Sequence, residues 1–219
     1  MQSSPRVPWN TTFLVLVITA GAFTFSRQVP YVHLIKHCDD LGISADKSST
    51  IYLFVGIFAS LGRFGGGALC DMKFVNTRLL FQASTFVMGA STLLLTLAKH
   101  YGGLVAYAII FCSADGLMMT SSVIECLKSV EESKNASAFG LQMMFSGLFA
   151  LISPPLSGLM ADKYGNYIAA FLMAGGVGVF ASLIPFIILC VKRESKEDEE
   201  ENLDVDIEEE AVPRLESSV

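Results

Sequence analysis

The chain has 219 residues, of which 52% are hydrophobic and only 16% are charged, whereas a soluble domain of this length carries about a quarter charged residues. The formal net charge of −6 comes from residues 194–219, which hold twelve of the 21 acidic residues, so that residues 1–193 are net positive. This composition excludes an ordinary soluble domain and gives no reason to expect a nucleic-acid partner.

Six apolar stretches are long enough to cross a bilayer as helices, which takes about 20 residues. In chain order they cover residues 13–32, 50–69, 78–98, 103–127, 138–161 and 167–191. The connections between them are short, except for the long loop expected at 34–49. We therefore predict an all-α membrane protein with a polar segment at 1–12, a six-helix domain at 13–191 and a disordered acidic tail at 192–219.

The distribution of basic residues predicts the orientation. An even number of spans places both termini on the same side of the membrane, and eight basic residues lie on that side against four in the opposite loops. Because cytoplasmic segments carry an excess of Lys and Arg, we expect both termini in the cytoplasm. The protein is thus expected to be a multi-pass protein of the lipid bilayer, at the plasma membrane.

A short motif occurs twice. The second span ends in GALCD, from Gly67 to Asp71, and the fifth ends in GLMAD, from Gly158 to Asp162, 91 residues later. Each copy follows the middle span of a group of three, and in a six-span chain the two copies lie on opposite membrane faces. A three-plus-three repeat of inverted topology produces this arrangement and recurs inside the halves of transporters.

Two longer segments resemble known transporters. The sequence GRFGGGALCDMKFVNTR, from Gly62 to Arg78, resembles the loop signature of the major facilitator superfamily. The sequence SPPLSGLMADKYGNY, from Ser153 to Tyr167, is similar to a segment of the monocarboxylate transporter family. The resemblance implies helices 7 to 12 of a twelve-helix fold, which is half of a major facilitator fold with the first six helices absent.

Further residues support the resemblance, and one departs from it. Pro30-Tyr31 with Gly42-Ile43 resembles the family's segment around its seventh helix, and Arg63 matches the family's intramembrane arginine. The proton-coupled lactate carriers of the family have an aspartate one turn before this arginine, where this chain has Ala59. An acid occurs instead at Asp115, which is more like the branch that handles aromatic amino acids and iodothyronines. The resemblance therefore leaves the substrate open.

Two charged residues are the main candidates for a substrate site. Arg63 lies 13 residues into its span and Asp115 lies 12 residues into its own, so both are about 18–20 Å deep at ~1.5 Å per residue. We expect them to neutralise each other, since an isolated charge in the bilayer is costly. A substrate carboxylate could then compete with Asp115 for the guanidinium of Arg63. The alternative is an ion pair that only fixes helix packing.

Other polar residues in the spans are secondary candidates. Ser60, Ser113 and Gln142 are candidate substrate contacts, although hydroxyl groups in membrane helices often bond their own backbone. Arg27 lies near the predicted outer end of the first span and is expected to reach the interface. The candidate gating or loop residues are Gly67, Asp71, Arg78, Pro154, Pro155, Gly158 and Asp162. The two prolines are expected to break the fifth span and form either a gate or a kink.

No motif of an enzyme is present, so we expect no catalytic residues, no cofactor and no metal site. The five cysteines show no paired spacing and are expected to be free thiols. The chain ends in Glu-Ser-Ser-Val, and a free C-terminal Val219 with a serine two positions before it resembles a ligand for PDZ domains.

These features favour a secondary transporter of monocarboxylates, related organic anions or amino-acid-like carboxylates that works by alternating access. Because a complete site in such transporters lies between two halves, the chain is expected to be a fragment or truncated form that needs a missing N-terminal half or a second subunit. The alternative is a six-span protein that does not transport and acts as an interaction or regulatory protein. A channel is a third, weaker alternative.

Overall fold

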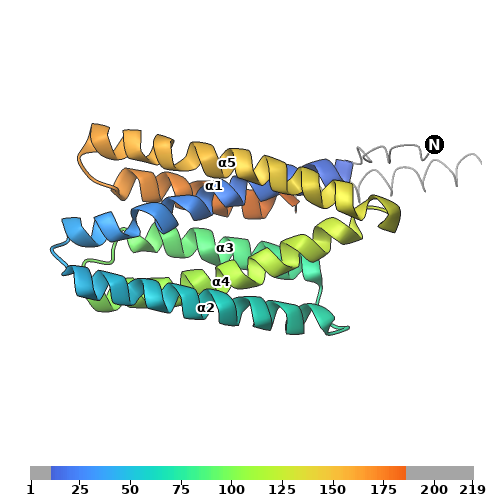
Figure 1. Cartoon of the computed structure of the whole chain (residues 1–219), viewed down its shortest axis with the longest axis horizontal. Coiled ribbons are helices and arrows are strands. Elements are labelled where there is room, and N and C mark those ends of the chain that lie inside the picture. The colour runs from blue at the N-terminus through green and yellow to red at the C-terminus, as the bar shows by residue number, and fades with distance from the viewer. Residues whose placement is uncertain (1–10, 186–219) are drawn as a thin grey trace, which may run out of the picture. The chain divides into compact units, whose positions relative to one another are not determined.

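The computed structural model describes residues 11–185, which form six long helices. These are α1 (Thr11–Asp40), α2 (Ala45–Asp71), α3 (Thr77–Leu95), α4 (Tyr101–Lys128), α5 (Asn135–Tyr164) and a sixth helix (Ile168–Pro185), with the short 3-10 helix η1 (Glu132–Lys134) before α5 (Figure 1). Each of the six is long and apolar enough to cross a membrane, and the described residues contain no strand. The predicted all-α architecture with six spans is confirmed.

The first helix is longer than predicted. It runs on to Asp40, and α2 begins at Ala45, so the prediction of a long loop at 34–49 is wrong. Gly42 adopts φ 72°, and the Ile43 amide donates to the Cys38 carbonyl at 3.0 Å, which is the usual way for a helix to end on a left-handed residue. Hydropathy had marked only the apolar part of α1, whereas the helix continues through polar residues to this turn.

The helices pair in a symmetric pattern. Helix α1 packs against α5, and α2 packs against α4. Exchanging the first helix with the fourth and the second with the fifth turns one of these pairs into the other, as an inverted repeat requires. In Figure 1 the C-terminal ends of α2 and α5, which carry the two copies of the motif, lie at opposite ends of the bundle. The predicted three-plus-three arrangement is confirmed.

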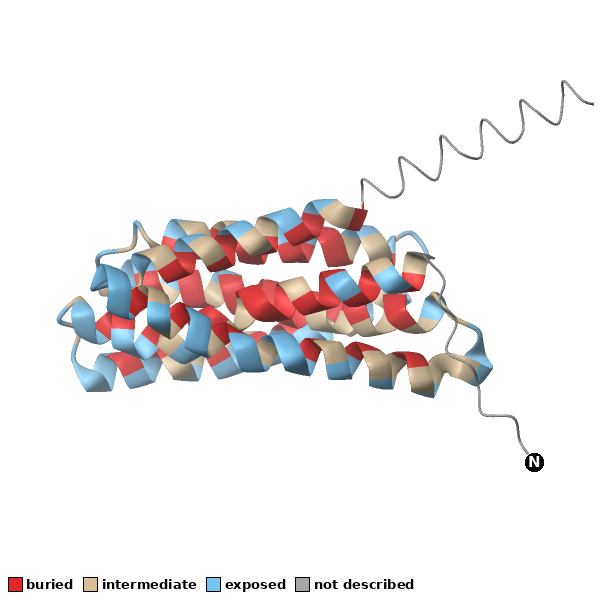
Figure 2. Ribbon diagram, turned by 90° about the horizontal axis from the view of Figure 1, so that it is seen from above, coloured by how far each residue is buried: buried red, intermediate tan, exposed pale blue. Residues whose placement is uncertain are grey.

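Small residues allow several of these contacts. A Cβ atom added at Gly89 of α3 would lie 2.6 Å from the backbone nitrogen of Val179 in the sixth helix, so these two backbones touch directly. Buried residues follow the sides of the helices that face one another, and exposed residues follow the opposite sides (Figure 2). Helix α2 exposes Leu53 and Phe64, and α5 exposes Leu151 and Leu159.

Several predictions concern other parts of the chain. Most of the N-terminal segment at 1–12, the end of the predicted sixth span at 186–191, the acidic tail at 192–219 and the C-terminal motif at Val219 lie outside the described residues. Of the five cysteines, the four that the structure describes are free thiols, as predicted.

Candidate functional site

A buried ion pair joins the middle of α1 to the middle of α4. The Arg27 Nε lies 3.7 Å from Oδ1 of Asp115, whose side chain has no exposed surface. The hydroxyl of Tyr31 donates to Oδ2 of Asp115 at 2.9 Å, and the guanidinium of Arg27 lies 5.5 Å from the centre of the Tyr31 ring. Arginine, tyrosine and aspartate therefore form one cluster in which the carboxylate is contacted on both oxygens.

The position of Arg27 corrects the sequence-based prediction for this residue. Because α1 extends to Asp40, Arg27 lies 13 residues before the end of the helix rather than at the membrane interface. Its side chain is 21% exposed and points to Asp115. An intramembrane arginine that meets a buried acid avoids most of the cost of burying either charge alone.

The predicted pairing of Asp115 with Arg63 is also wrong. Arg63 is exposed, and within residues 11–185 it makes no ion pair shorter than 4.0 Å. Helix α2 contacts α4 through Gly62, since a Cβ atom added there would lie 2.5 Å from the carbonyl oxygen of Ser113. The next residue points about 100° around the helix from Gly62. Gly116, the neighbour of Asp115, packs against the Arg63 backbone, so the two charged residues are at similar depths, but their side chains form no ion pair.

A cavity of about 220 Å³ that is open on one side lies beside the ion pair, between α1, α4 and α5. It is lined by Phe23, Thr24, Arg27, Met119, Ser122, Val123, Met143, Ser146, Gly147 and Ala150. Gln142 is buried behind this wall and donates from Nε2 to the Ser122 hydroxyl at 2.9 Å. The cavity thus combines a cation and hydroxyl groups with apolar side chains.

Two of the other predicted contacts lie elsewhere. The Ser60 hydroxyl donates to the Gly56 carbonyl of its own helix at 2.9 Å and faces a shallow groove on the exposed side of α2. Ser113 is half-buried, and its carbonyl faces Gly62. Of the five predicted substrate contacts, the structure therefore brings Asp115 and Gln142 to the neighbourhood of the cavity.

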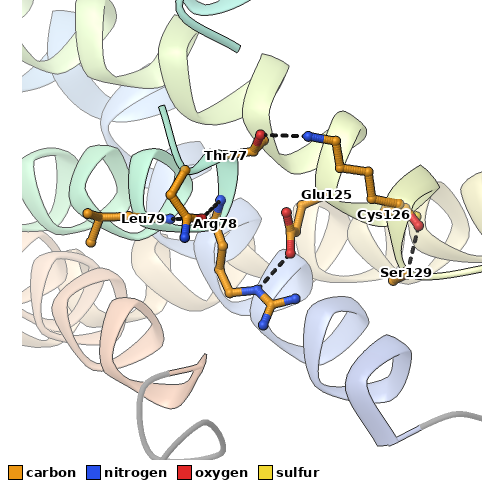
Figure 3. Close-up of polar contacts among 8 residues, drawn as sticks. Thr77, Arg78, Leu79, Glu125, Cys126 and Ser129 are labelled. Carbon is orange, nitrogen blue, oxygen red and sulfur yellow. Dashed lines mark hydrogen bonds and ion pairs between the residues drawn. The ribbon is translucent and has the colours of Figure 1, made fainter. Parts of the chain in front are cut away.

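A second ion pair joins the start of α3 to the last turns of α4 (Figure 3). The Nε of Arg78, at the start of α3, lies 2.7 Å from Oε1 of Glu125 near the end of α4. Beside it, Lys128 Nζ donates to the Thr77 hydroxyl at 2.9 Å, and the Asn76 side chain caps α3. Arg78 was singled out from the sequence, whereas Glu125 was missed.

The residues of the repeated motif at the ends of α2 and α5 make no close contacts that explain them. Asp71 and Asp162 are both exposed. Gly67 and Gly158 have open space where a Cβ atom would lie, so neither is required by close packing within the described residues.

The two prolines of α5 do not break the helix, which runs without interruption from Asn135 to Tyr164. Ser157 donates to the carbonyls of Ser153 and Pro154, and its hydroxyl lies 2.8 Å from His33 Nε2 on α1. Neighbouring side chains and hydroxyl groups commonly support proline inside membrane helices in this way. The predicted break at Pro154 and Pro155 is therefore wrong.

Some site residues were missed or undervalued. Tyr31 was noted only as part of a family segment, and nothing in its local pattern shows that it reaches Asp115 on a helix 84 residues away. Arg27 carried a usable signal, because a charged residue inside an apolar run is by default a candidate for function. Glu125 carried the same signal, being the acid closest to the apolar part of α4 after Asp115.

Comparisons with known proteins agree with this architecture. The chain is 27% identical to monocarboxylate transporter 10 of Mus musculus over 183 residues, covering 81% of this chain and 36% of that protein. It is 26% identical to monocarboxylate transporter 3 of Rattus norvegicus over 194 residues, covering 86% of this chain and 39% of that protein. The chain thus spans less than half the length of these relatives. They are transporters rather than enzymes, in agreement with the prediction that the chain is not an enzyme.

Among solved structures, the fucose:proton symporter FucP of E. coli matches with a TM-score of 0.68 at 16% identity, covering 82% of this chain and 43% of that chain. At this identity the match concerns the fold alone. No protein-family model matches the chain. The chain is therefore a multi-pass membrane protein that has the fold of one half of a major facilitator transporter and is related in sequence to the monocarboxylate transporters.

Proposed function

We propose that this chain forms the substrate-binding half of a transporter for singly charged carboxylates at the plasma membrane. The observation that carries the proposal is the buried Arg27–Asp115 pair beside a cavity, inside a bundle of membrane-spanning helices. Relatives that are named monocarboxylate transporters support the choice of a carboxylate as substrate.

The charge balance of the bundle supports a monoanion. Three charged residues lie well inside the described helices: Arg27, Arg63 and Asp115. Two positive charges and one negative charge leave a net charge of +1 in a region where an uncompensated charge costs about 2.5–3.5 kcal/mol or more. One bound carboxylate would neutralise this excess, whereas a cation would increase it.

The helix pairing is consistent with alternating access. Helices α1 and α5 form one contact and α2 and α4 form its counterpart in the repeat, so two similar units can rock against each other around a fixed site. The Arg78–Glu125 pair at one end of the bundle can open and close with such a motion. In this proposal Gly67, Asp71, Gly158 and Asp162 belong to the moving ends. Another set of helices, on a second subunit or on a missing N-terminal half, completes the transporter.

Transport can be tested with the full chain in reconstituted vesicles, where a second copy of the chain can supply the completing helices. We expect uptake of at least one member of a panel of radiolabelled lactate, pentanoate and phenylalanine, and we expect Arg63→Ala to abolish it while the protein still inserts. Lys47→Ala, which removes a positive charge from the first turn of the same helix, serves as the matched control. Correctly inserted protein that takes up none of the panel would contradict transport by copies of this chain alone, which leaves either a complex with a different N-terminal half or the non-transporting alternative.

The orientation is a separate prediction. A reporter fused after Val219 is expected to be cytoplasmic, and a label on a cysteine introduced at Ile43, in the α1–α2 turn, is expected to react from outside the cell. Finding both positions on one side of the membrane would contradict the proposed topology and the inverted repeat together.

A further inference from the structure

We infer that a second copy of this chain completes the bundle, with α2 of each copy packed against α5 of the other. This copy is the further set of helices that the proposed function requires, so the inference rests on that proposal and names the partner. The two copies are related by a twofold axis along the membrane normal, which is also the axis that relates the two halves of a major facilitator transporter.

Helices α2 and α5 are the two least buried of the six described helices. Only 22% of the residues in the apolar stretch of each are buried, against 44% to 56% in the other four. In Figure 1 α5 lies along the upper edge of the bundle and α2 along the lower edge. Because the inverted repeat relates these two helices to each other, the bundle has two corresponding uncovered faces.

The uncovered face of α2 is unsuited to lipid. Arg63 is exposed on this face, 18 residues after Ala45 in a helix of 27 residues, and within residues 11–185 it has no ion-pair partner. Charged residues inside membrane helices face other helices or a water-filled space, because contact with hydrocarbon is costly. The position of Arg63 therefore indicates that further helices cover α2.

A second copy can cover both faces at once. Every copy inserts in the same orientation, because its basic residues are the same, so a twofold axis along the membrane normal is allowed. Such an axis exchanges the two edges of the bundle and brings each α2 against the α5 of the other copy. The same contact then forms twice, as in most homodimers. Helix α5 carries no charged residue from Asn135 to Ala161, so Arg63 meets no like charge across this contact.

A small residue of α2 lies at the depth of a large residue of α5. The start of α2 and the end of α5 lie at the same end of the bundle in Figure 1. Gly56 comes 11 residues after Ala45, and Leu151 comes 13 residues before Tyr164, so at ~1.5 Å per residue they are about 17 Å and about 20 Å from that end. Leu151 is 74% exposed, and a Cβ atom added at Gly56 would have no neighbour within 4 Å.

A second pair repeats this relation with the large residue on α2. Phe64, which is 80% exposed, comes 19 residues after Ala45, and Gly147 comes 17 residues before Tyr164. Their depths are about 29 Å and about 26 Å by the same rise. Gly147 also has open space where a Cβ atom would lie. Glycines that admit a neighbouring helix are typical of helix contacts in membranes, so the two faces are complementary in size.

The cavity beside Arg27 opens toward the same face. Gly147 lines this cavity and is also exposed on α5. A second copy packed on α5 therefore covers the open side of the cavity. In a single copy the cavity has no wall there, so the candidate site is complete only in the dimer.

Cross-linking of the full chain in lipid vesicles tests the contact and its register. The double variant Gly56→Cys/Leu151→Cys should form a covalent dimer under mild oxidation. Gly56→Cys/Leu159→Cys is the matched control, since Leu159 is also exposed on α5 but lies eight residues, or about 12 Å, further along the helix. We expect at least fivefold more covalent dimer from the first pair, after subtraction of the signal from the five native cysteines.

The strength of association can be measured by energy transfer between two fluorophores fused after Val219 on separate batches of the chain, over a range of protein-to-lipid ratios. We expect a reversible dimer. Gly56→Phe fills the small position of α2 and should weaken dimerisation at least tenfold. Gly176→Phe, on the exposed side of the sixth helix with equally open space, should change it less than twofold.

The outcomes separate the dimer from the function. A chain that stays monomeric at every ratio overturns the inference, whether lipid or a different set of helices then covers α2 and α5. Equal cross-linking of the two cysteine pairs, or equal loss in the two glycine variants, also overturns it. Dimers with the expected pattern but without uptake contradict the proposed function and uphold the contact. Uptake by monomeric Gly56→Phe upholds the function and overturns the contact. If Gly56→Phe does not fold, the two cysteine pairs decide.

Discussion

The two corresponding helix pairs make the same kind of contact with different chemistry. Gly62 and Gly66 of α2 lie 91 residues before Ser153 and Ser157 of α5, the same separation as between the two copies of the repeated motif. In the α2–α4 pair, glycines allow backbone to touch backbone. In the α1–α5 pair, Ser153 instead donates to the Phe25 carbonyl at 2.8 Å.

This difference separates two ways of holding membrane helices together. The glycine contact depends on close packing, which small residues provide in the absence of a hydrophobic driving force between helices. The serine contact depends on hydrogen bonds between a side chain and the backbone of a neighbouring helix. The first should tolerate no added volume, and the second should tolerate the loss of a hydroxyl at a small cost. The ion pair between Arg27 and Asp115 joins the two helix pairs, because it connects α1 of the α1–α5 pair to α4 of the α2–α4 pair.

Removing the Arg27–Asp115 pair should have the largest effect on the stability of the bundle. Arg27→Ala leaves Asp115 buried without a counter-charge, which is expected to lower the free energy of unfolding by about 3–5 kcal/mol. The double variant Arg27→Ala/Asp115→Ala should recover most of this loss, because no isolated charge remains. The measurement is reversible unfolding of the purified protein in mixed detergent micelles. A double variant as unstable as Arg27→Ala would show that the charge pair is not the link.

Adding volume to the glycine contact should have the next largest effect. A Cβ atom at Gly116 would lie 2.6 Å from the Ala59 carbonyl oxygen and 2.6 Å from the Arg63 amide nitrogen. Gly116→Val must therefore push α2 and α4 apart and should cost about 1–3 kcal/mol. Gly65→Val on α2 is the matched control, since a Cβ atom there has no neighbour within 4 Å. Equal melting temperatures for the two variants would refute the close contact.

Removing hydroxyls from the serine contact should have the smallest effect. Ser153→Ala breaks the hydrogen bond to α1 and should cost about 0.6 kcal/mol, the average for such bonds between membrane helices. Ser60→Ala removes a hydroxyl that bonds only within its own helix, so its melting temperature should be unchanged. A larger loss in Ser60→Ala than in Ser153→Ala would contradict the assignment of the α1–α5 contact to Ser153.

The sequence predicted the fold class well, because hydropathy and a short repeat report directly on membrane spans and their symmetry. It predicted the partner of Asp115 poorly. Depth along a helix can be counted from the sequence, but the direction of a side chain around the helix depends on which face packs. That face of α2 is set by Gly62, whose role as a contact becomes visible only when α4 is placed. The end of α1 was missed for a related reason, since hydropathy marks apolar segments and not the turn at Gly42.

The two helix contacts should accept different amino-acid substitutions during evolution. Codons for glycine and serine can differ by a single base, so mutation readily interconverts them. On α5, replacing Ser153 by glycine removes one hydrogen bond and meets no obstruction. On α2, replacing Gly62 by serine drives a side chain into the Ser113 carbonyl. Exchange between glycine and serine should therefore be tolerated at Ser153 and not at Gly62. Natural variants should accumulate at Ser153 well before they appear at Gly62.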